Sequence, residues 1–159
     1  MRIGHGIDAH RLVANRPLML GGVRIQYEMG LLGHSDGDAV AHALGDALLG
    51  AAGLGDLGQH FSPNDPKWHD VAGVTLLRVI ASKIRDAGYM VESAHVVAIA
   101  EEPRLAPHTQ AMTIAIAQAL DVNPDRIVVT ATTTDGMGFA GRGEGIAASA
   151  VALLLSLPG

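Results

Sequence analysis

Residues 36–53 read DGDAVAHALGDALLGAAG and carry the clearest helix pattern in the chain. Asp36 or Asp38 is suited to cap this helix, because a carboxylate accepts hydrogen bonds from the free N–H groups of a first turn. Gly53 supplies a stop signal at the other end. Between them the apolar residues recur at helical spacing, at Val40, Ala43, Leu44, Ala47, Leu48 and Ala51.

Strand and helix patterns alternate on both sides of this segment. The tail, residues 145–157, is ambiguous, because its alanines favour a helix by propensity while its apolar run suits a buried strand. The alternation predicts an α/β or α+β class, with a mixed sheet and three main helices packed on one face. We expect strands over 1–10, 91–100 and 125–134, a hairpin over 16–25 around Gly21-Gly22, and further helices over 71–88 and 107–120.

The composition limits the class of protein. A length of 159 residues, 48% of them hydrophobic, suits a single domain over 1–159. The mean hydropathy of +0.27 is high for a soluble monomer, so we expect part of the apolar surface to meet another subunit. A net charge of -5 and 3% aromatic residues argue against a nucleic-acid partner, which needs clustered basic side chains or stacking rings.

The sequence features that are missing restrict both the residues that can bind a metal ion and the expected location of the protein in the cell. There is no cysteine, so a metal ion must be held by carboxylates and by some of the eight histidines. No run of 18 apolar residues and no leader-like pattern occurs, so we expect a cytoplasmic protein without membrane contact.

The segment GIDAH, residues 6–10, offers two such ligands. On a strand Asp8 and His10 point to the same face, which makes half of a zinc site. His42, in the first turns of the 36–53 helix, is the best third ligand. Asp46, four residues further on, lies within reach of the His42 ring as a hydrogen-bond acceptor. Spacing alone leaves the alternative open, in which His10 is a surface residue and His42 a core histidine.

The segment GHSDG, residues 33–37, fits the G-x-S-x-G pattern of serine hydrolases, with Ser35 as the nucleophile. The preceding strand is short and the chain is small for that fold, so we prefer a polar loop that caps the helix. His34 and Ser35 could instead hydrogen-bond an anionic group near the helix amino terminus.

Three further segments are polar or rich in glycine. Residues 53–58 and 136–141 match G-x-G-x-x-G, and tight turns are favoured over dinucleotide binding at both. Residues 131–145 gather three threonines, a carboxylate at Asp135, and Arg142, whose planar fork suits a phosphate. Residues 101–108 follow an apolar strand and form either a plain connection or a loop whose backbone reads a base.

Taken together, these pieces resemble the 2-C-methyl-D-erythritol 2,4-cyclodiphosphate synthase family over essentially the whole chain. The matching segments are RIGHGIDAH, GHSDGDAVAHALGDALLGAAGLGDLG and TTTDGMGFAGRGEG, in this order. The resemblance implies an α/β homotrimer with an active site at each subunit interface, and a strand at the ambiguous tail. It also implies one Zn²⁺ per subunit on Asp8, His10 and His42, and Mg²⁺ or Mn²⁺ on the substrate diphosphate with Asp135 contributing.

The implied reaction is a phosphoryl cyclisation of the lyase type in the non-mevalonate isoprenoid pathway. The 2-phosphate of 4-diphosphocytidyl-2-C-methyl-D-erythritol 2-phosphate attacks the β-phosphorus and expels CMP. Attacker and target are both anionic, so two divalent ions are needed to neutralise charge and align them. No protein nucleophile is required.

By the same resemblance, His34 and Thr133 would steady the transition state. Residues 100–106 would hold cytosine, with Arg104 near the phosphates. The implied substrate contacts are Asp8, Ala9, His10, His34, Ser35, Asp56, Leu57, Gly58, Phe61, Ser62, Pro63, Asn64, Asp65, Ala100, Glu101, Glu102, Pro103, Arg104, Leu105, Ala106, Thr132, Thr133, Thr134, Asp135, Phe139 and Arg142.

The chain departs from the family pattern at three places: Asp135 stands where Glu is usual, FSPNDP replaces FPDTDP, and HDVAG lacks the GADS pattern. Two other interpretations remain, namely a serine hydrolase through Ser35 and a non-catalytic trimer that binds nucleotide and zinc.

Overall fold

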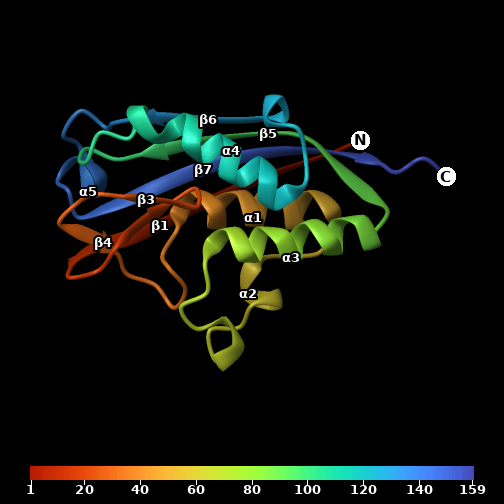
Figure 1. Ribbon diagram of the computed structural model, residues 1–159, viewed down its shortest axis with the longest axis horizontal. Helices are drawn as coiled ribbons and strands as arrows, with labels where there is room; N and C mark the ends of the chain where they lie inside the picture. Colours follow the sequence, from red (N-terminus) through yellow and green to blue (C-terminus); the bar gives the residue numbers. More distant parts are fainter.

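The computed structural model describes residues 1–159 as a five-stranded sheet with helices on one face (Figure 1). The strand order is β4-β1-β7-β5-β6, in which only β5 and β6 pair in parallel. The strands are β1 Arg2–Ala14, β4 Met29–Leu31, β5 Tyr89–Ile99, β6 Ile127–Thr132 and β7 Gly145–Ser156, with a separate hairpin of β2 Leu18–Leu20 and β3 Val23–Ile25. The expected mixed sheet is therefore present.

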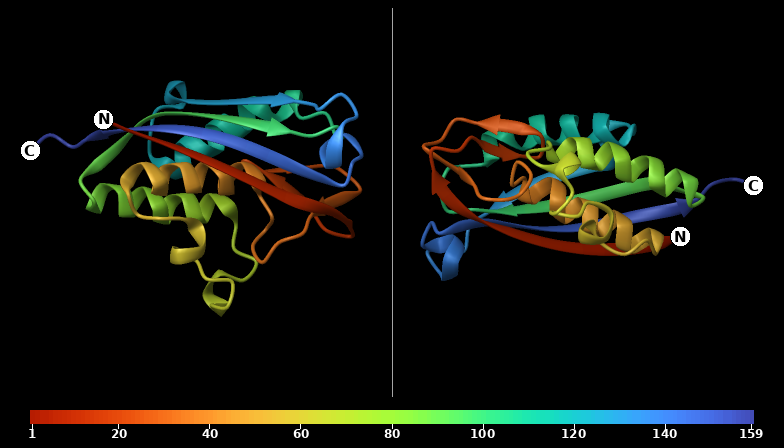
Figure 2. Two further views of the ribbon diagram at one scale, coloured as in Figure 1. Left: turned by 180° about the vertical axis from the view of Figure 1, so that it is seen from behind. Right: turned by 90° about the horizontal axis from the view of Figure 1, so that it is seen from below.

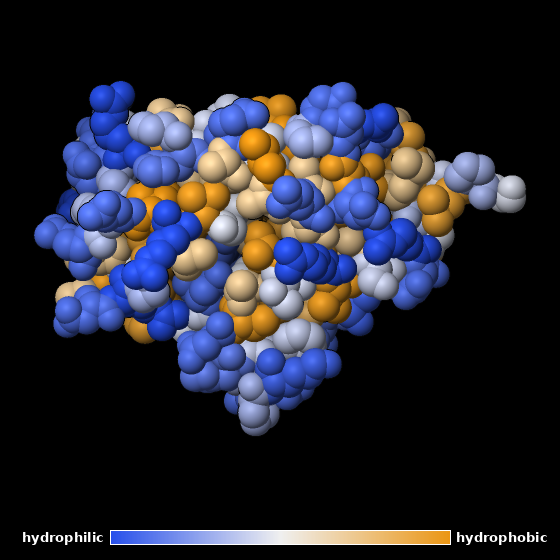
Figure 3. Space-filling view, in the orientation of Figure 1, coloured by the Kyte–Doolittle hydropathy of each residue, from blue (hydrophilic) through white to orange (hydrophobic).

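Three main helices cover the sheet, and two views show them on the same side of it (Figure 2). They are α1 Ala39–Ala52, α3 Gly73–Asp86 and α4 Thr109–Leu120. Two single-turn helices, α2 Leu57–His60 and α5 Gly138–Gly141, and three 3₁₀ turns at Pro66–Trp68, Ala106–His108 and Pro124–Arg126 complete the elements. The segment between α1 and α3 hangs below α3 in Figure 1 and is largely hydrophilic in Figure 3.

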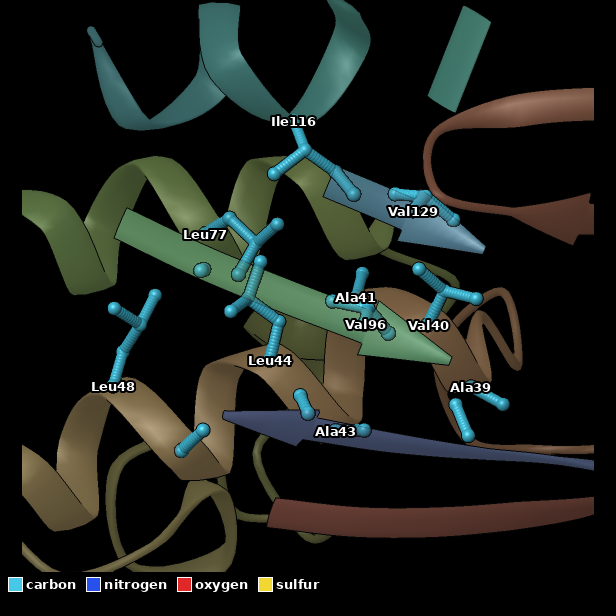
Figure 4. Packing of buried hydrophobic residues seen from close by; sticks show 14 of the residues in the cluster. Ala39, Val40, Ala41, Ala43, Leu44, Leu48, Leu77, Val96, Ile116 and Val129 are labelled. Carbon is cyan, nitrogen blue, oxygen red and sulfur yellow. The ribbon is translucent and has the colours of Figure 1, made fainter. Parts of the chain in front are cut away.

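The core lies between the sheet and the helices. Leu44 and Leu48 of α1 and Leu77 of α3 are fully buried beneath the sheet side chains (Figure 4). Each fully buried aliphatic side chain of this kind contributes about 1.5–3 kcal/mol through the hydrophobic effect. The same layer fixes α1 relative to β1 and β7, the strands on which it lies.

The tail forms strand β7, as the family resemblance implied. β7 is bordered on both edges, by β1 and by β5, so its backbone groups are satisfied by sheet pairing. Its Ala148, Ala150 and Ala152 are buried on the helix-covered face. Pairing on two sides decides this segment against its helix propensity.

Two glycines of β1 let α1 approach the sheet closely. A Cβ atom at Gly4 would lie 1.8 Å from the Ala47 carbonyl oxygen, and one at Gly6 would lie 2.1 Å from the Ala43 carbonyl oxygen. Only glycine fits under the helix at these positions. The backbone of β1 and the backbone of α1 are thus in direct contact just before β1 reaches Asp8.

The opposite face of the sheet carries none of the three main helices, and we call it the open face. Ile3 and Ile7 of β1 point from it and are 68% and 66% exposed, and Val151 of β7 is 47% exposed. Two hydrogen-bonded pairs lie among them, His5 with Ser149 and His95 with Thr130, each at 2.9 Å. None of the helices combines the length and the apolar character needed to cross a bilayer.

Candidate metal centre and adjoining cavities

The amino terminus of α1 is held by a buried carboxylate. Asp38 is the N-cap residue, and it accepts hydrogen bonds from the N–H groups of Ala41, Gly21 and Gly22 at 2.8–2.9 Å. Asp36, the other expected cap, instead accepts the N–H groups of Asp38 and Gly73. Burial and the nearby charge of Asp36 raise the pKa of Asp38 to about 6, although its N–H donors favour the charged form.

Asp8, His10 and His42 converge on one point. Asp8 and His10 project from β1 toward the helices, and His42 projects from the first turns of α1. Asp8 Oδ2 lies 2.7 Å from His10 Nε2 and 3.2 Å from His42 Nδ1, and the two nitrogens are 3.2 Å apart. Tetrahedral zinc with bonds of about 2.0–2.1 Å has ligand atoms roughly 3.3 Å apart. One oxygen and two imidazole nitrogens at these spacings form a site that could hold a divalent metal ion.

The hydrogen bonds around the two rings support this interpretation. His10 Nδ1 donates to the Leu32 carbonyl oxygen at 2.7 Å, so a neutral ring directs the lone pair of Nε2 toward Asp8. His42 Nε2 is 2.9 Å from Ser35 Oγ, which leaves Nδ1 facing the same point. Two lone pairs and a carboxylate repel one another unless a cation, either a proton or a metal ion, lies between them.

The pKa values of the pair reflect this need for a cation. Burial disfavours the charge on Asp8, but hydrogen bonds from His10 and His42 outweigh it and lower the pKa of Asp8 to about 2. Burial also opposes the charge on His10, and the Asp8 carboxylate outweighs it and raises the pKa of His10 above 6.5. Both shifts favour a proton shared between Asp8 and His10 at the point where the three groups converge.

No hydrogen bond joins Asp46 to the His42 ring in this structure. Asp46 Oδ1 accepts the N–H of Leu57 at 2.8 Å. Leu57 is the first residue of α2, and the N–H groups of a first turn have no partner within their own helix. Asp46 therefore joins α1 to α2, while the ring nitrogens of His42 face Ser35 and Asp8.

A cavity of about 220 Å³ opens beside the three ligands. His34 and Ser35 are among its polar lining residues, and Leu57, Phe61, Trp68, Val71 and Leu76 are its apolar ones. The lining residues are His10, His34, Ser35, His42, Leu57, Gly58, Phe61, Pro63, Trp68, His69, Val71 and Leu76. Asp56 and Asp65 lie nearby as caps of α2 and of the 3₁₀ turn at Pro66–Trp68.

Four of these lining residues were not expected from the sequence. Trp68 packs edge-on against Phe61, with ring centroids 4.8 Å apart. His69, Val71 and Leu76 complete the same wall. The one available signal was the single tryptophan of the chain, which stands in a loop that is otherwise hydrophilic.

The segment expected to hold cytosine lines a different cavity, of about 170 Å³. β5 ends at Ile99 and the parallel strand β6 ends at Thr132, so the segments after both strands meet at one sheet edge. The lining residues are Ala100, Glu101, Arg104, Leu105, Ala106, Ala131, Thr132 and Thr133. None of them lines the cavity beside the metal ligands, so one chain holds the expected site in two parts.

Other expected contacts lie around a third cavity, of about 200 Å³, at the start of β7. Ala9, His10 and Phe139 line it together with Arg11, Glu144 and Gly145. Arg142 pairs with Glu144 at 3.2 Å on the surface. Asp135 is exposed in the turn after β6, with a φ of 53°. The expected contacts Ser62, Asn64, Glu102, Pro103 and Thr134 line none of these three cavities.

The GHSDG segment has one feature of a serine hydrolase. Ser35, His42 and Asp8 form a hydrogen-bonded chain in the order of a catalytic triad. His42 Nδ1 also faces His10, however, and α1 begins only at Ala39, so Ser35 lies in a loop rather than at a strand-to-helix elbow. This arrangement suits a metal ligand held by a hydroxyl group better than a nucleophile.

Comparisons with known proteins agree with one another. The model of the YgbB family matches residues 1–155. A 2-C-methyl-D-erythritol 2,4-cyclodiphosphate synthase of Moorella thermoacetica is 55% identical over 155 residues, which cover 98% of this chain and 95% of that protein.

Solved structures show the same fold. The bifunctional IspDF from Campylobacter jejuni superposes with a TM-score of 0.94 at 42% identity, covering 98% of this chain and 42% of that one. A 2C-methyl-D-erythritol-2,4-cyclodiphosphate synthase in its CDP-bound form gives a TM-score of 0.88 at 39% identity, covering 97% of this chain and 100% of the other.

Proposed function

The chain belongs to the YgbB family, and from this membership we propose that it is an enzyme that makes 2-C-methyl-D-erythritol 2,4-cyclodiphosphate. Its substrate is 4-diphosphocytidyl-2-C-methyl-D-erythritol 2-phosphate, and CMP is released. The observation that carries the proposal is the convergence of Asp8, His10 and His42 beside a cavity of about 220 Å³. The relatives at about half identity do not favour a serine hydrolase or a non-catalytic binder.

We propose Zn²⁺ as the ion held by the three ligands, because two imidazoles and one carboxylate at tetrahedral spacing suit it. Mg²⁺ or Mn²⁺, bound through the substrate diphosphate, is the proposed second ion, with the Asp135 carboxylate contributing. When bound, such ions neutralise phosphate charge and polarise the phosphorus–oxygen bonds.

The side chains of the chain supply binding and alignment. Leu57, Phe61 and Leu76 give the cavity apolar lining that would exclude water from the erythritol part of the substrate. His34 lines the same cavity, and its ring is suited to stabilise the charge on a phosphate oxygen. The 2-phosphate then needs only to be held in line with the β-phosphorus while CMP departs.

Cytosine would bind in the other cavity, between Ala100–Ala106 and Thr132–Thr133. Arg104 lines that cavity and carries a guanidinium suited to the phosphates. Because the metal ligands lie in a different cavity of the same chain, we propose that a neighbouring subunit completes each site. The exposed Ile3, Ile7 and Val151 of the open face support a homotrimer assembled through this face.

Direct assay tests the proposal. The purified protein is incubated with the diphosphocytidyl substrate, and ³¹P NMR follows the cyclic diphosphate while CMP is quantified. We expect both products in equal amounts, and their loss after chelation and return after metal addition. A protein that binds the substrate but releases no CMP would contradict the proposal, as would labelling of Ser35 by a phosphonate probe with activity that resists chelation.

A further inference from the structure

We propose that Arg16 is a positioning residue for the metal centre, because its guanidinium holds the segment 32–35 that orients both histidine ligands. The proposal rests on the proposed function in one respect, that Asp8, His10 and His42 bind a divalent ion. Arg16 itself touches none of these three ligands through any hydrogen bond or ion pair of the structure.

The contact between Arg16 and this segment is direct. Arg16 lies in the turn between β1 and β2, after Asn15, whose φ of 59° reverses the chain. Its Nη2 donates to the Gly33 carbonyl oxygen at 3.2 Å and to the Ser35 carbonyl oxygen at 2.5 Å. These are the only protein hydrogen bonds that the two carbonyls receive.

The same segment supplies one hydrogen bond to each histidine ligand. The Leu32 carbonyl oxygen accepts from His10 Nδ1, and the Ser35 hydroxyl lies 2.9 Å from His42 Nε2. Each bond selects which ring nitrogen faces the ion, Nε2 for His10 and Nδ1 for His42. Arg16 binds the carbonyls of Gly33 and Ser35, which lie next to the Leu32 carbonyl and the Ser35 hydroxyl in the chain. The guanidinium therefore fixes the spacing between the two groups that contact His10 and His42.

The other hydrogen bonds of the segment 32–35 do not hold the carbonyls that Arg16 binds. The Leu32 N–H donates to the Arg11 carbonyl, and the His34 carbonyl accepts from the Asp70 N–H, each at 2.9 Å. Neither of these two bonds involves the carbonyl groups of Gly33 or Ser35. Without the guanidinium, two half-buried carbonyls lose their partner, and the segment gains freedom at the residue that orients His42.

Lysine is not equivalent at this position. An ammonium group is a compact charge that rotates on a flexible stem, whereas the two N–H bonds of Arg16 Nη2, which donate to both carbonyls, have fixed directions in the guanidinium plane. Arg16→Lys is therefore expected to retain the positive charge but only part of the restraint. Arg24 provides a matched control, because it is exposed and makes no side-chain hydrogen bond.

The experiment compares Arg16→Met, Arg16→Lys and Arg24→Met with the natural chain. Zn²⁺ affinity is measured by competition with a chromophoric chelator, and the visible absorption of the Co²⁺-loaded protein reports ligand geometry. Loss of a hydrogen bond behind a metal ligand weakens metal affinity by about 10- to 100-fold. We expect about tenfold or more for Arg16→Met with an altered Co²⁺ spectrum, a smaller loss for Arg16→Lys, and no change for Arg24→Met.

The variant Ser35→Ala tests whether Arg16 affects the metal centre through Ser35. If Arg16 acts through Ser35, the double variant with Arg16→Met loses less affinity than the product of the two single losses. Fully independent losses would overturn the route and with it the proposal.

A folded Arg16→Met protein with unchanged Zn²⁺ affinity and Co²⁺ spectrum would also overturn the proposal. If Arg16→Met does not fold, Arg16→Lys decides in the same way. Failure of the proposed function gives a different result, in which the natural chain itself binds no metal.

Discussion

Asp8 and His42 are separated by 34 positions in the sequence, yet Asp8 Oδ2 lies 3.2 Å from His42 Nδ1. A strand and a helix supply the two groups, and the contact between their backbones at Gly4 and Gly6 sets the distance. The ligands thus adjoin a direct backbone contact between β1 and α1. This geometry and the two faces of the sheet lead to testable predictions.

Replacement of His42 by alanine is expected to abolish turnover. The change removes one of three ligands and leaves the charge of Asp8 opposite His10 alone. We expect metal content, measured by atomic emission on the purified protein, to fall to a small fraction of one ion per chain. Normal CMP release from a variant without bound zinc would defeat the assignment of the centre.

Replacement of Asp135 by glutamate is expected to preserve most of the activity. The carboxylate remains, although glutamate lacks the tolerance of aspartate for a positive φ, a conformation that costs an ordinary L-residue roughly 1–2 kcal/mol. Asp135→Asn is the control, and we expect it to lose activity because it removes the charge. A folded, zinc-loaded glutamate variant without activity would mean that the turn is matched to the shorter acid.

Zinc binding is expected to release a proton near neutral pH. Zinc requires a neutral His10 ring, and the Asp8 carboxylate raises the pKa of that ring, so zinc must displace a proton that is held more tightly than on a free imidazole. Below that pKa the affinity should fall about tenfold per pH unit. Asp8, with a pKa of about 2, is already ionised and adds nothing in this range. Calorimetry in buffers of different ionisation enthalpy measures the proton count, and a pH-independent affinity would contradict the prediction.

The free energy of unfolding of the metal-free protein should fall as the pH rises. A raised pKa in the folded state means that His10 stabilises the fold below pH 6.5, and this stabilisation is lost as pH rises through its folded pKa. Thermal unfolding of the chelated protein, compared with His10→Gln, isolates this contribution.

Replacement of Gly4 by alanine is expected to destabilise the fold by about 1–3 kcal/mol or more, as overpacking does. The added Cβ would overlap the Ala47 carbonyl oxygen, so α1 must move away from β1. Gly50→Ala in α1 is the control, because its Cβ would meet nothing within 4 Å. Urea unfolding checks both, and equal midpoints would contradict the close packing of α1 on β1.

Replacement of Ile7 by glutamate is expected to break the proposed homotrimer and leave the subunit folded. The side chain is 66% exposed in the isolated chain, so its change costs the subunit little. Ile114→Glu, at an exposed position of α4, serves as the control and should remain trimeric. Light scattering coupled to size-exclusion chromatography gives the mass, and an unchanged mass for both variants would exclude assembly through the open face.

The sequence predicted those features that depend on local periodicity. The helix around His42 and the shared face of Asp8 and His10 follow from spacings of 3.6 and 2 residues. The apolar pattern of the helix could not reveal the hydrogen-bond partner of Asp46, because that contact depends on where α2 lies against α1. Trp68 and Arg16 were missed for the same reason, since their roles arise only when distant segments pack together.

The strand at the tail was decided by family resemblance rather than by propensity. Its alanines are as compatible with a helix as with a strand, and only its position between β1 and β5 selects the extended form. Local preference is a weak guide for a segment whose neighbours on both sides come from elsewhere in the chain.

The two glycines beneath α1 have a consequence for engineering. Since main-chain contact and not the ion sets how far β1 stands from the helix, a designer could exchange the donor atoms at positions 8 and 10 to favour a softer or harder cation. The scaffold would keep its register through such an exchange, and ion preference becomes a property that can be altered separately from folding.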